Sequence, residues 1–290
     1  MAKTRLQSAA NRDGSFLSVF LLNIRSLRNK ISELNATIET LNCSPDVIAL
    51  TESWLTENDP IPFLSGYQKP FVLNRGSRGG GVCMFVKNGL NAFMKCCNQE
   101  YESITVCVNG TKKNFFFTLF YCSPSRNKLN YISHIEEQIK QNFGNHVILG
   151  DINIDLLSES DLKQNLIDTM KSYNFSINSK IEPTRETATT SSCIDFIASN
   201  LESTESNILK LSISDHYALQ ILVPNASKKP EHYCVYRNLK VFDNQETRPN
   251  FLFSLNHWLQ KIDMNLTCDS KMQKFIDYFC QNSGQICSVN

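Results

Sequence analysis

The sequence predicts an α/β protein, because short apolar runs typical of strands alternate with segments of helical periodicity. The first observation is a βαβ-like opening, with apolar runs at 16–24 and 47–50 on either side of a helical pattern. The second is a middle section of strand-like runs, at 103–108 and 115–121, which predicts antiparallel pairing. The third is the return of strand and helix patterns after residue 128.

The opening helix is predicted from its apolar spacing. Apolar side chains recur at intervals of four and three residues, which places them on one face of a helix. These residues are Leu27, Ile31, Leu34, Ile38 and Leu41. Ser26 is the expected N-cap, and Pro45 follows shortly after the end of the pattern.

The later elements follow from the same patterns. A turn-rich loop at 74–81 precedes a strand at 82–86. A helix at about 128–143 should bury one face made by Leu129, Ile132, Ile135 and Ile139. The remaining expected elements are a strand at 146–149, a helix at 161–174, and strands at 194–198 and 217–223.

The change of texture after residue 224 predicts three segments. These are a flexible lead at 1–15, one folded domain at 16–224, and a linker with a partly helical connector at 225–290. The chain of 290 residues is 41% hydrophobic and 20% charged, which is typical of a soluble globular protein. Its net charge of +1 provides no overall attraction for nucleic acid, although a local basic patch would suffice.

The cysteines and the N-terminus indicate an intracellular protein. The 11 cysteines are odd in number and irregular in spacing, so we expect reduced thiols rather than a disulfide framework. No signal peptide and no apolar stretch of membrane-spanning length is visible, so no membrane partner is expected.

Polar side chains at predicted strand ends are the main functional signal. Asn23 and Glu52 end the first two strands, and three further clusters lie at 150–153, 192–195 and 214–216. They combine carboxylate, amide and imidazole groups, which suit a hard divalent cation and a phosphate ester. The sequence therefore predicts a metal-dependent phosphodiesterase.

We expect Mg²⁺ to be held by Glu52, with Asp215 as a second carboxylate and Asn23 as a carbonyl ligand or a supporting group. Asp151 and Asn153 place a base and an amide on one side of an extended segment.

His216 is the expected group for stabilising phosphoryl charge or moving a proton, and such a His needs an orienting carboxylate. Asp195 suits that task better than Asp215, because adjacent residues on a strand point to opposite faces. Taken singly, each residue has a simpler explanation: a turn Asp, a surface Glu, a structural His, or a core residue at Tyr121. Their joint occurrence at strand ends carries the prediction.

The same residues belong to stretches that resemble the exonuclease–endonuclease–phosphatase superfamily, which has the DNase I fold. The matching stretches are 22–27, 50–55, 78–82, 120–124, 150–153, 192–195 and 214–219. Within the superfamily they are most similar to the endonuclease domain of LINE-type (non-LTR) retrotransposons. The segment 236–238 is similar to the connector that precedes the reverse transcriptase in such elements.

The resemblance implies a four-layer α/β/β/α sandwich of two mixed sheets. It implies a Mg²⁺-dependent DNA endonuclease, with Mn²⁺ as a substitute, that leaves a 3′-hydroxyl to prime reverse transcription. DNA, element RNA and a reverse transcriptase domain of the same polyprotein would be its partners, with the nucleus as the place of action. The implied roles are metal binding by Asn23, Glu52 and Asp215, phosphate contact by Tyr121 and Asn153, water activation by Asp151, and orientation of His216 by Asp195.

One departure bears on the alternatives. Abasic-site repair enzymes of this superfamily usually carry an Asp where this chain has Arg25, which disfavours the repair function. A catalytically silent DNA-binding module derived from a retroelement is the other alternative, and the complete set of catalytic residue types disfavours it. The expected DNA contacts, from loops near the motifs, are Arg78, Arg126, Thr184, Arg185 and Ser192.

Overall fold

The computed structural model describes residues 16–41, 44–76, 79–110, 113–202 and 205–225, together with Lys274. The chain divides into two compact units, Met1–Tyr236 and Arg237–Asn290, and the fold described below belongs to the first. The expected lead at 1–15 and nearly all of the expected connector at 225–290 lie outside the described residues, so these limits stay predictions. Within the described ranges, no helix has the length and apolar character needed to cross a membrane.

The first sheet has six strands in the order β13-β14-β1-β2-β4-β3. β1 and β2 are parallel neighbours, as the βαβ-like opening predicts, and the other pairs are antiparallel. Its strands are β1 (Phe16–Asn23), β2 (Val47–Thr51), β3 (Phe71–Leu73), β4 (Val82–Val86), β13 (Glu205–Leu209) and β14 (Ala218–Pro224).

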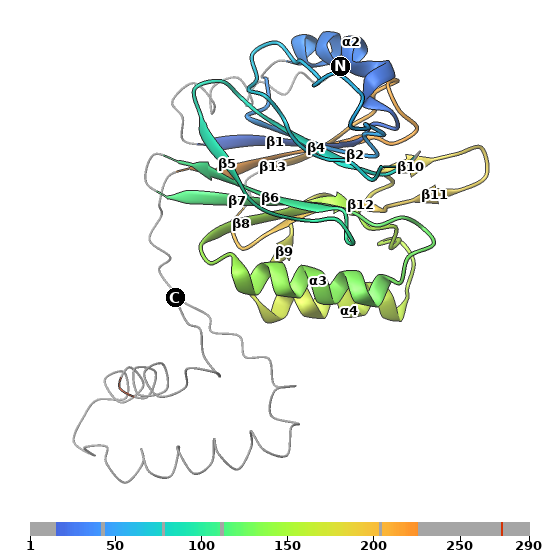
Figure 1. Ribbon diagram of the computed structural model, residues 1–290. Helices are drawn as coiled ribbons and strands as arrows, with labels where there is room; N and C mark the ends of the chain where they lie inside the picture. Colours follow the sequence, from blue (N-terminus) through green and yellow to red (C-terminus); the bar gives the residue numbers. More distant parts are fainter. Residues whose placement is uncertain are drawn as a thin grey trace. The chain divides into compact units, whose positions relative to one another are not determined.

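The second sheet also has six strands, in the order β5-β6-β7-β8-β12-β9. β7 and β8 are parallel, whereas β5, β6 and β7 form the antiparallel middle section. Its strands are β5 (Asn91–Asn98), β6 (Ser103–Asn109), β7 (Asn114–Tyr121), β8 (Asn145–Asp151), β9 (Ser176–Ile177) and β12 (Asp195–Ser199). A short hairpin of β10 (Arg185–Glu186) and β11 (Ser191–Ser192) projects from the body of the domain (Figure 1).

The two sheets pack face to face, and helices cover their outer faces (Figure 1). Helix α2 (Leu27–Thr40) covers the first sheet, and helices α3 (Lys128–Gln141) and α4 (Asp161–Ser172) cover the second. This is the four-layer α/β/β/α sandwich that the sequence predicts.

Three apolar clusters hold these layers together. One lies between the sheets and is built from inward-facing residues such as Val19, Val106 and Leu149. The second joins the other face of the second sheet to α3 and α4, and the third joins the first sheet to α2. Strands with both faces covered bury every residue, which explains why they appear in the sequence as continuous apolar runs.

Two local predictions are corrected. Ser26 occupies the N-cap position of α2, but its backbone is left-handed and its side chain makes no capping hydrogen bond. Leu129 is 50% exposed, so the buried face of α3 starts at Tyr131 and Ile132 and continues through Ile135 and Ile139. Strand β5 was not expected, because it is an edge strand whose exposed and half-buried residues alternate.

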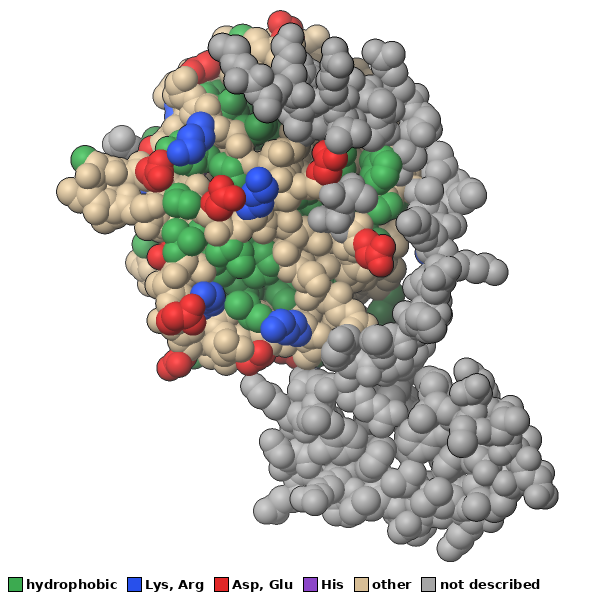
Figure 2. All heavy atoms as spheres, turned by 180° about the vertical axis from the view of Figure 1, so that it is seen from behind, with side chains coloured by type: hydrophobic (Ala, Val, Ile, Leu, Met, Phe, Trp, Pro, Cys, Tyr) green, Lys and Arg blue, Asp and Glu red, His purple; other side chains and the backbone are tan. Residues whose placement is uncertain are grey.

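The face turned away from the view of Figure 1 carries mixed charges. Figure 2 shows basic and acidic side chains close to one another, around an apolar area, with no broad basic patch among the described residues of this face.

Candidate active site

The candidate active site lies where the parallel strand pairs of both sheets end. Asn23 is paired in register with Thr51, the residue before Glu52, and Tyr121 is paired with Asp151. Asp195 in turn lies opposite Asp151 on the neighbouring strand. The buried strands thus bring residues that are far apart in the sequence to one edge of the sandwich.

The backbone at this edge is unusual. Arg25, Glu52 and Asn153 have positive φ values of 46°, 51° and 50°, in the left-handed region that non-glycine residues rarely adopt. Such conformations persist only where surrounding structure holds them, and they concentrate at functional sites. Here Glu52 directly follows β2, and Arg25 and Asn153 lie two residues after the ends of β1 and β8, so each positive φ falls where a strand gives way to the loop that forms the site.

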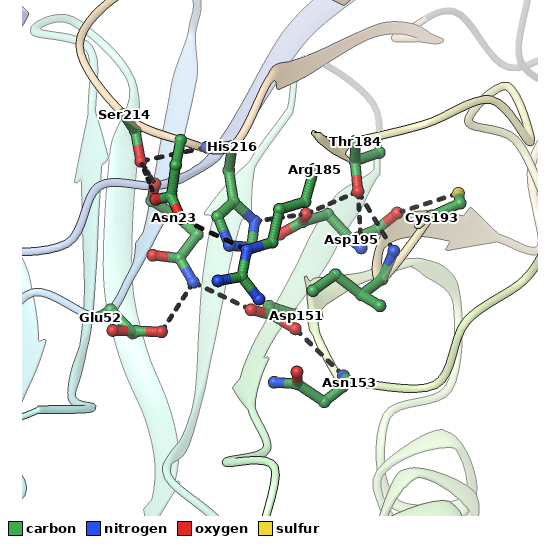
Figure 3. A network of polar contacts seen from close by, with 12 residues as sticks. Asn23, Glu52, Asp151, Asn153, Thr184, Arg185, Cys193, Asp195, Ser214 and His216 are labelled. Atoms are coloured by element: carbon green, nitrogen blue, oxygen red, sulfur yellow. Dashed lines mark hydrogen bonds and ion pairs between the residues drawn. The ribbon is translucent and has the colours of Figure 1, made fainter. Parts of the chain in front are cut away.

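Asn23 connects the two halves of the site (Figure 3). Its Nδ2 donates to Glu52 Oε1 at 3.0 Å and to Asp151 Oδ2 at 2.9 Å. The side chain is fully buried, and its Oδ1 has no hydrogen-bond partner in the described part of the chain. A buried, unpaired amide oxygen is costly unless a ligand uses it, so this atom suits the predicted role as a metal ligand.

Glu52 receives two further hydrogen bonds. Tyr121 donates its hydroxyl to Oε1 at 3.0 Å, and Trp54 donates Nε1 to Oε2 at 3.0 Å. Burial and the negative charges of Glu52 and Asp151 raise the pKa of Tyr121, so the hydroxyl stays protonated and remains a donor.

His216 is held by a buried carboxylate, as the sequence predicts. Its Nδ1 lies 2.8 Å from Asp195 Oδ2, and both side chains are only 3% exposed. The same Oδ2 accepts the Thr184 hydroxyl at 2.8 Å, and Thr184 Oγ1 accepts the backbone N–H of Asp195 at 3.3 Å. The pair fixes the imidazole orientation and leaves its Nε2 for chemistry.

Asp151 is the most strongly perturbed carboxyl of the site. Burial and the nearby charge of Asp195 raise its pKa to about 8, against the opposing effects of His216 and Asn23. Its Oδ1 accepts the backbone N–H of Asn153 at 3.0 Å, while Asn153 Nδ2 donates to the Cys122 carbonyl at 2.9 Å. A carboxyl with a pKa close to neutrality is suited to general-base chemistry.

The carboxylates around His216 change its pKa in the direction opposite to burial. Burial alone would lower the pKa of His216, but Asp195, Asp151 and Asp215 together raise it. The imidazolium form is therefore favoured, which suits contact with a phosphate group.

Asp215 is paired with two arginines. Its Oδ2 accepts from Arg25 Nη1 at 2.7 Å and from Arg185 Nε at 3.3 Å. Partial burial raises the pKa of Asp215, but His216, Arg25 and Arg185 outweigh that effect and hold the pKa below its ordinary value. Asp215 is thus a carboxylate that already faces cations.

The residues present fit a divalent cation. The guanidinium of Arg25 lies between two carboxylates, with Nε 3.9 Å from Glu52 Oε2 and Nη1 2.7 Å from Asp215 Oδ2. One positive group thus already stands where both carboxylates converge, and the unpaired Asn23 Oδ1 adds a neutral oxygen. Carboxylate and carbonyl oxygens are the ligands that Mg²⁺ prefers.

A second group of potential ligands lies deeper in the site. One ligand atom from each of Asp151, Asp195 and His216 falls within 4.8 Å of the others, and all three residues are buried. Because His216 Nδ1 is already bonded to Asp195, this cluster of three residues is better suited to proton transfer than to holding the predicted cation. The more accessible pair, Glu52 and Asp215, remains our predicted metal site.

The predicted DNA contacts fall into different places. Arg126 is exposed and Ser192 is half-buried on β11, whereas Arg78 lies outside the described residues. Arg185 lies in the site itself, against Asp215. Thr184 is corrected, because it is fully buried and its hydroxyl is bonded to Asp195, so its side chain has no surface to offer to DNA.

Two residues of the site, Trp54 and Ser214, were given no role from the sequence, and Arg25 was noted there without its partner. Trp54 binds Glu52, Arg25 binds Asp215, and Ser214 donates its hydroxyl to the Asn23 carbonyl at 2.6 Å. Ser214 and Trp54 lie inside the quoted motifs, so adjacency was the available signal. The pairing of Arg25 with Asp215 joins residues 190 positions apart and had no local signal.

Two mixed sheets with outer helices, and this set of residues at the edge between them, form the DNase I-like fold that the sequence predicts. Residues 115–220 match the family described as "Endonuclease-reverse transcriptase". This match, over part of the chain, agrees with the predicted resemblance to the endonuclease domain of LINE-type retrotransposons. The comparison with curated proteins gave no match.

Solved structures share the fold at low identity. The endonuclease domain of TRAS1, a telomere-specific non-LTR retrotransposon, matches with a TM-score of 0.56 and 13% identity over 72% of this chain and 98% of that chain. The AP endonuclease LMAP from Leishmania major matches with a TM-score of 0.60 and 14% identity over 73% of this chain and 89% of that chain. An AP endonuclease from Archaeoglobus fulgidus gives 0.54 and 12%, over 71% and 99%.

Proposed function

We propose that this protein is a metal-dependent DNA endonuclease that nicks its target and leaves a 3′-hydroxyl for target-primed reverse transcription. The observation that carries the proposal is the position of Asn23, which binds Glu52 and Asp151 at once. The predicted metal ligands, the predicted base and the Asp195–His216 pair are thereby brought to one edge of the sandwich. The match of residues 115–220 to the "Endonuclease-reverse transcriptase" family supports the proposed link to reverse transcription.

Each side chain has a role in phosphodiester hydrolysis. Asp151 positions the attacking water and accepts its proton, and the oxygen of that water forms the new bond to phosphorus. The bond from phosphorus to the 3′-oxygen breaks, and the 3′-oxygen takes up a proton from solvent water to become the hydroxyl. The imidazolium of His216, with Tyr121 and Asn153, stabilises the negative charge on the phosphoryl oxygens.

Glu52, Asp215 and Asn23 would hold the divalent cation, Mg²⁺ or Mn²⁺ in its place. When bound, the cation supplies positive charge that stabilises the phosphoryl oxygens and the leaving oxygen.

Cationic side chains would bind the DNA backbone. Arg126, Arg185 and Arg78 are the proposed phosphate contacts, with Ser192 on the β10–β11 hairpin as a further contact. Element RNA and a reverse transcriptase domain are the proposed partners, and the nucleus is the proposed place of action.

Conversion of supercoiled plasmid to open circles, with and without Mg²⁺, tests the proposal. Nicking should require Mg²⁺ or Mn²⁺ and should fall at least about a thousandfold in His216→Ala and Glu52→Ala, which each remove a group acting on the phosphate. Glu57→Ala is the matched control, because Glu57 is an exposed acid close in sequence. Full nicking by both site variants would sink the assignment.

Abasic-site repair is the second candidate, because AP endonucleases share the fold. It predicts strong preference for an oligonucleotide with an abasic site over intact duplex. We expect that preference to be weak, because this chain has Arg25 at the position where the repair enzymes usually carry an Asp. Arg25 instead pairs with Asp215. Binding of DNA without cleavage under any divalent metal would instead support the catalytically silent DNA-binding module.

A further inference from the structure

An ion pair outside the reacting groups joins the two sheets beside the site. Arg75 follows β3 of the first sheet, and Glu102 precedes β6 of the second. Arg75 Nε donates to Glu102 Oε1 at 2.8 Å, and Arg75 Nη2 donates to the same oxygen. The Glu102 side chain is 2% exposed and that of Arg75 26%, so the pair is largely shielded from water.

Glu102 also binds two segments that lead to the site. Its second carboxylate oxygen, Oε2, accepts the backbone N–H of Gly81 at 2.6 Å. Its backbone carbonyl accepts the N–H of Tyr121 at 3.2 Å. One residue thus holds both the glycine turn of the first sheet and the end of β7 in the second.

The glycine turn in turn holds the backbone next to Glu52. The carbonyls of Gly81 and Gly80 accept the N–H groups of Ser53 and Trp54 at 3.2 and 3.0 Å. A Cβ on Gly80 would lie 2.3 Å from Glu102 Oε2, which shows how closely the turn packs against the ion pair. Restraint at Glu102 is therefore transmitted to the residues that follow Glu52.

Arg75 packs against Tyr121, the residue that binds Glu52 from the second sheet. Its guanidinium carbon lies 5.5 Å from the centroid of the Tyr121 ring, within the range of a cation–π interaction. The Tyr121 hydroxyl reaches Glu52 Oε1 at 3.0 Å. The ion pair therefore contacts the ring of Tyr121 directly. Through the glycine turn, it also restrains the backbone next to Glu52, the residue that the Tyr121 hydroxyl binds.

We propose that Arg75 and Glu102 are positioning residues that hold Tyr121 against Glu52 across the junction of the two sheets. The inference rests on the proposed function, in which Tyr121 contacts the scissile phosphate. A buried ion pair contributes little net stability compared with apolar side chains of the same size. Retaining one here is explained by geometry, because the planar guanidinium binds the carboxylate in a fixed orientation while facing the ring.

Conservative variants test the positioning role. Glu102→Gln keeps an oxygen for Gly81 but removes the charge, and Arg75→Lys keeps the charge but removes the planar group. We expect kcat for plasmid nicking to fall about tenfold to a hundredfold in each, with little change in KM for DNA, because small displacements of a catalytic group reduce the chemical step. Arg28→Lys is the matched control, because Arg28 Nη1 pairs with Asp59 Oδ1 at 2.9 Å on the exposed surface.

A double-mutant cycle with Tyr121→Phe separates positioning from general stability. If the ion pair acts through the Tyr121 hydroxyl, Arg75→Lys should cause little further loss of kcat once that hydroxyl is absent. Fully additive losses would overturn the inference, because they would show that the pair acts elsewhere.

A spectroscopic measurement keeps the inference testable if the protein does not nick DNA. Fluorotyrosine incorporated only at position 121 should give a single ¹⁹F resonance in the otherwise unaltered protein. Glu102→Gln and Arg75→Lys should shift that resonance toward the position of unfolded protein, and Arg28→Lys should not. An unchanged resonance in both variants would contradict the inference, while absence of nicking in the unaltered protein would contradict only the proposed function.

Discussion

Two buried histidines in the second half of the fold show how their neighbours decide what a histidine can do. His216 faces three carboxylates, Asp195, Asp151 and Asp215, and its pKa is raised in spite of burial. His146 lies at the start of β8, where Thr118 Oγ1 is 2.8 Å from its Nε2 and the rings of Phe116 and Phe175 pack against it. Burial lowers the pKa of His146 to about 3, with a smaller contribution from Lys95.

The groups around His146 continue as a neutral network. Thr118 and Thr105 hydroxyls are 2.8 Å apart, and Thr105 donates to Gln138 Oε1 at 3.1 Å under helix α3. No carboxylate takes part in these contacts. The comparison teaches that a buried histidine with carboxylates can carry charge in a reaction, whereas one with hydroxyls and rings serves packing.

The largest expected difference between the two regions is in activity. Asp195→Asn should lower kcat about 10²- to 10⁴-fold, because the imidazole of His216 loses the carboxylate that orients it and stabilises its charge. His146→Gln should leave kcat per folded molecule within about twofold, since His146 contacts no group of the site. Plasmid nicking, normalised to the folded fraction from circular dichroism, measures both. Comparable losses in the two variants would break the comparison.

The second expected difference is in the pH dependence of stability. An unfolded histidine binds a proton near its ordinary pKa of 6.5, whereas folded His146 does so only near 3. Below pH 6.5 the unfolded state therefore binds more protons, and the free energy of unfolding falls as the pH is lowered toward 3. The loss is on the order of 5 kcal/mol at most, at about 1.4 kcal/mol per unit of pKa difference.

Urea unfolding at several pH values between 4 and 7 checks this expectation. His146→Gln should make the free energy of unfolding depend less steeply on pH, by the equivalent of up to one proton bound on unfolding, because glutamine does not titrate. Equal slopes in the two proteins would show that His146 is protonated in the folded state.

The third prediction concerns the neutral network itself. Thr118→Val keeps the shape of a fully buried side chain but removes the hydroxyl that binds His146 and Thr105. It should lower the free energy of unfolding by about 1–3 kcal/mol, the cost of leaving buried polar groups unpaired. Chemical denaturation gives the value, and a parallel nicking assay should show unchanged kcat. A large loss of kcat without loss of stability would contradict the separation of the two regions.

The smallest expected effect is on metal binding. Arg25→Ala should tighten binding of Mn²⁺ a few-fold, because the guanidinium no longer competes for Asp215 and Glu52. The effect is small since the Arg25 side chain is 41% exposed and water screens its charge. Isothermal titration of DNA-free protein measures the affinity, with Arg28→Ala as the control. Weaker binding in Arg25→Ala would show that Arg25 supports the metal site.

Much of the fold follows from local sequence, because strands buried on both faces, such as β1, β4 and β8, are continuous apolar runs. The pairing of Asp195 with His216 was also predictable, since alternation along a strand excludes Asp215. Strand β5 was not predictable in this way, because edge strands lack that signature and Phe93 is exposed.

The roles of Thr184, Arg25 and Arg75 depend on tertiary contacts. Thr184 looks like a polar loop residue in the sequence, yet its hydroxyl donates a hydrogen bond to the buried Asp195. Arg75 resembles a surface cation in a glycine-rich loop, and its partner Glu102 is 27 residues away. Arg25 meets Asp215 because β1 and β14 are neighbours in the first sheet, whereas Arg75 meets Glu102 only through the packing of one sheet on the other.

The amide of Asn23 reaches from the first sheet to a carboxylate of the second, so the constellation exists only while the sheets are packed. A ligand that engages groups from both sheets acts as a clamp on the whole sandwich. By mass action, such a ligand raises the melting temperature of the entire domain rather than ordering one loop. The protein should accordingly lose its active geometry and its tertiary structure in a single transition, with substrate binding and folding sharing the same interface.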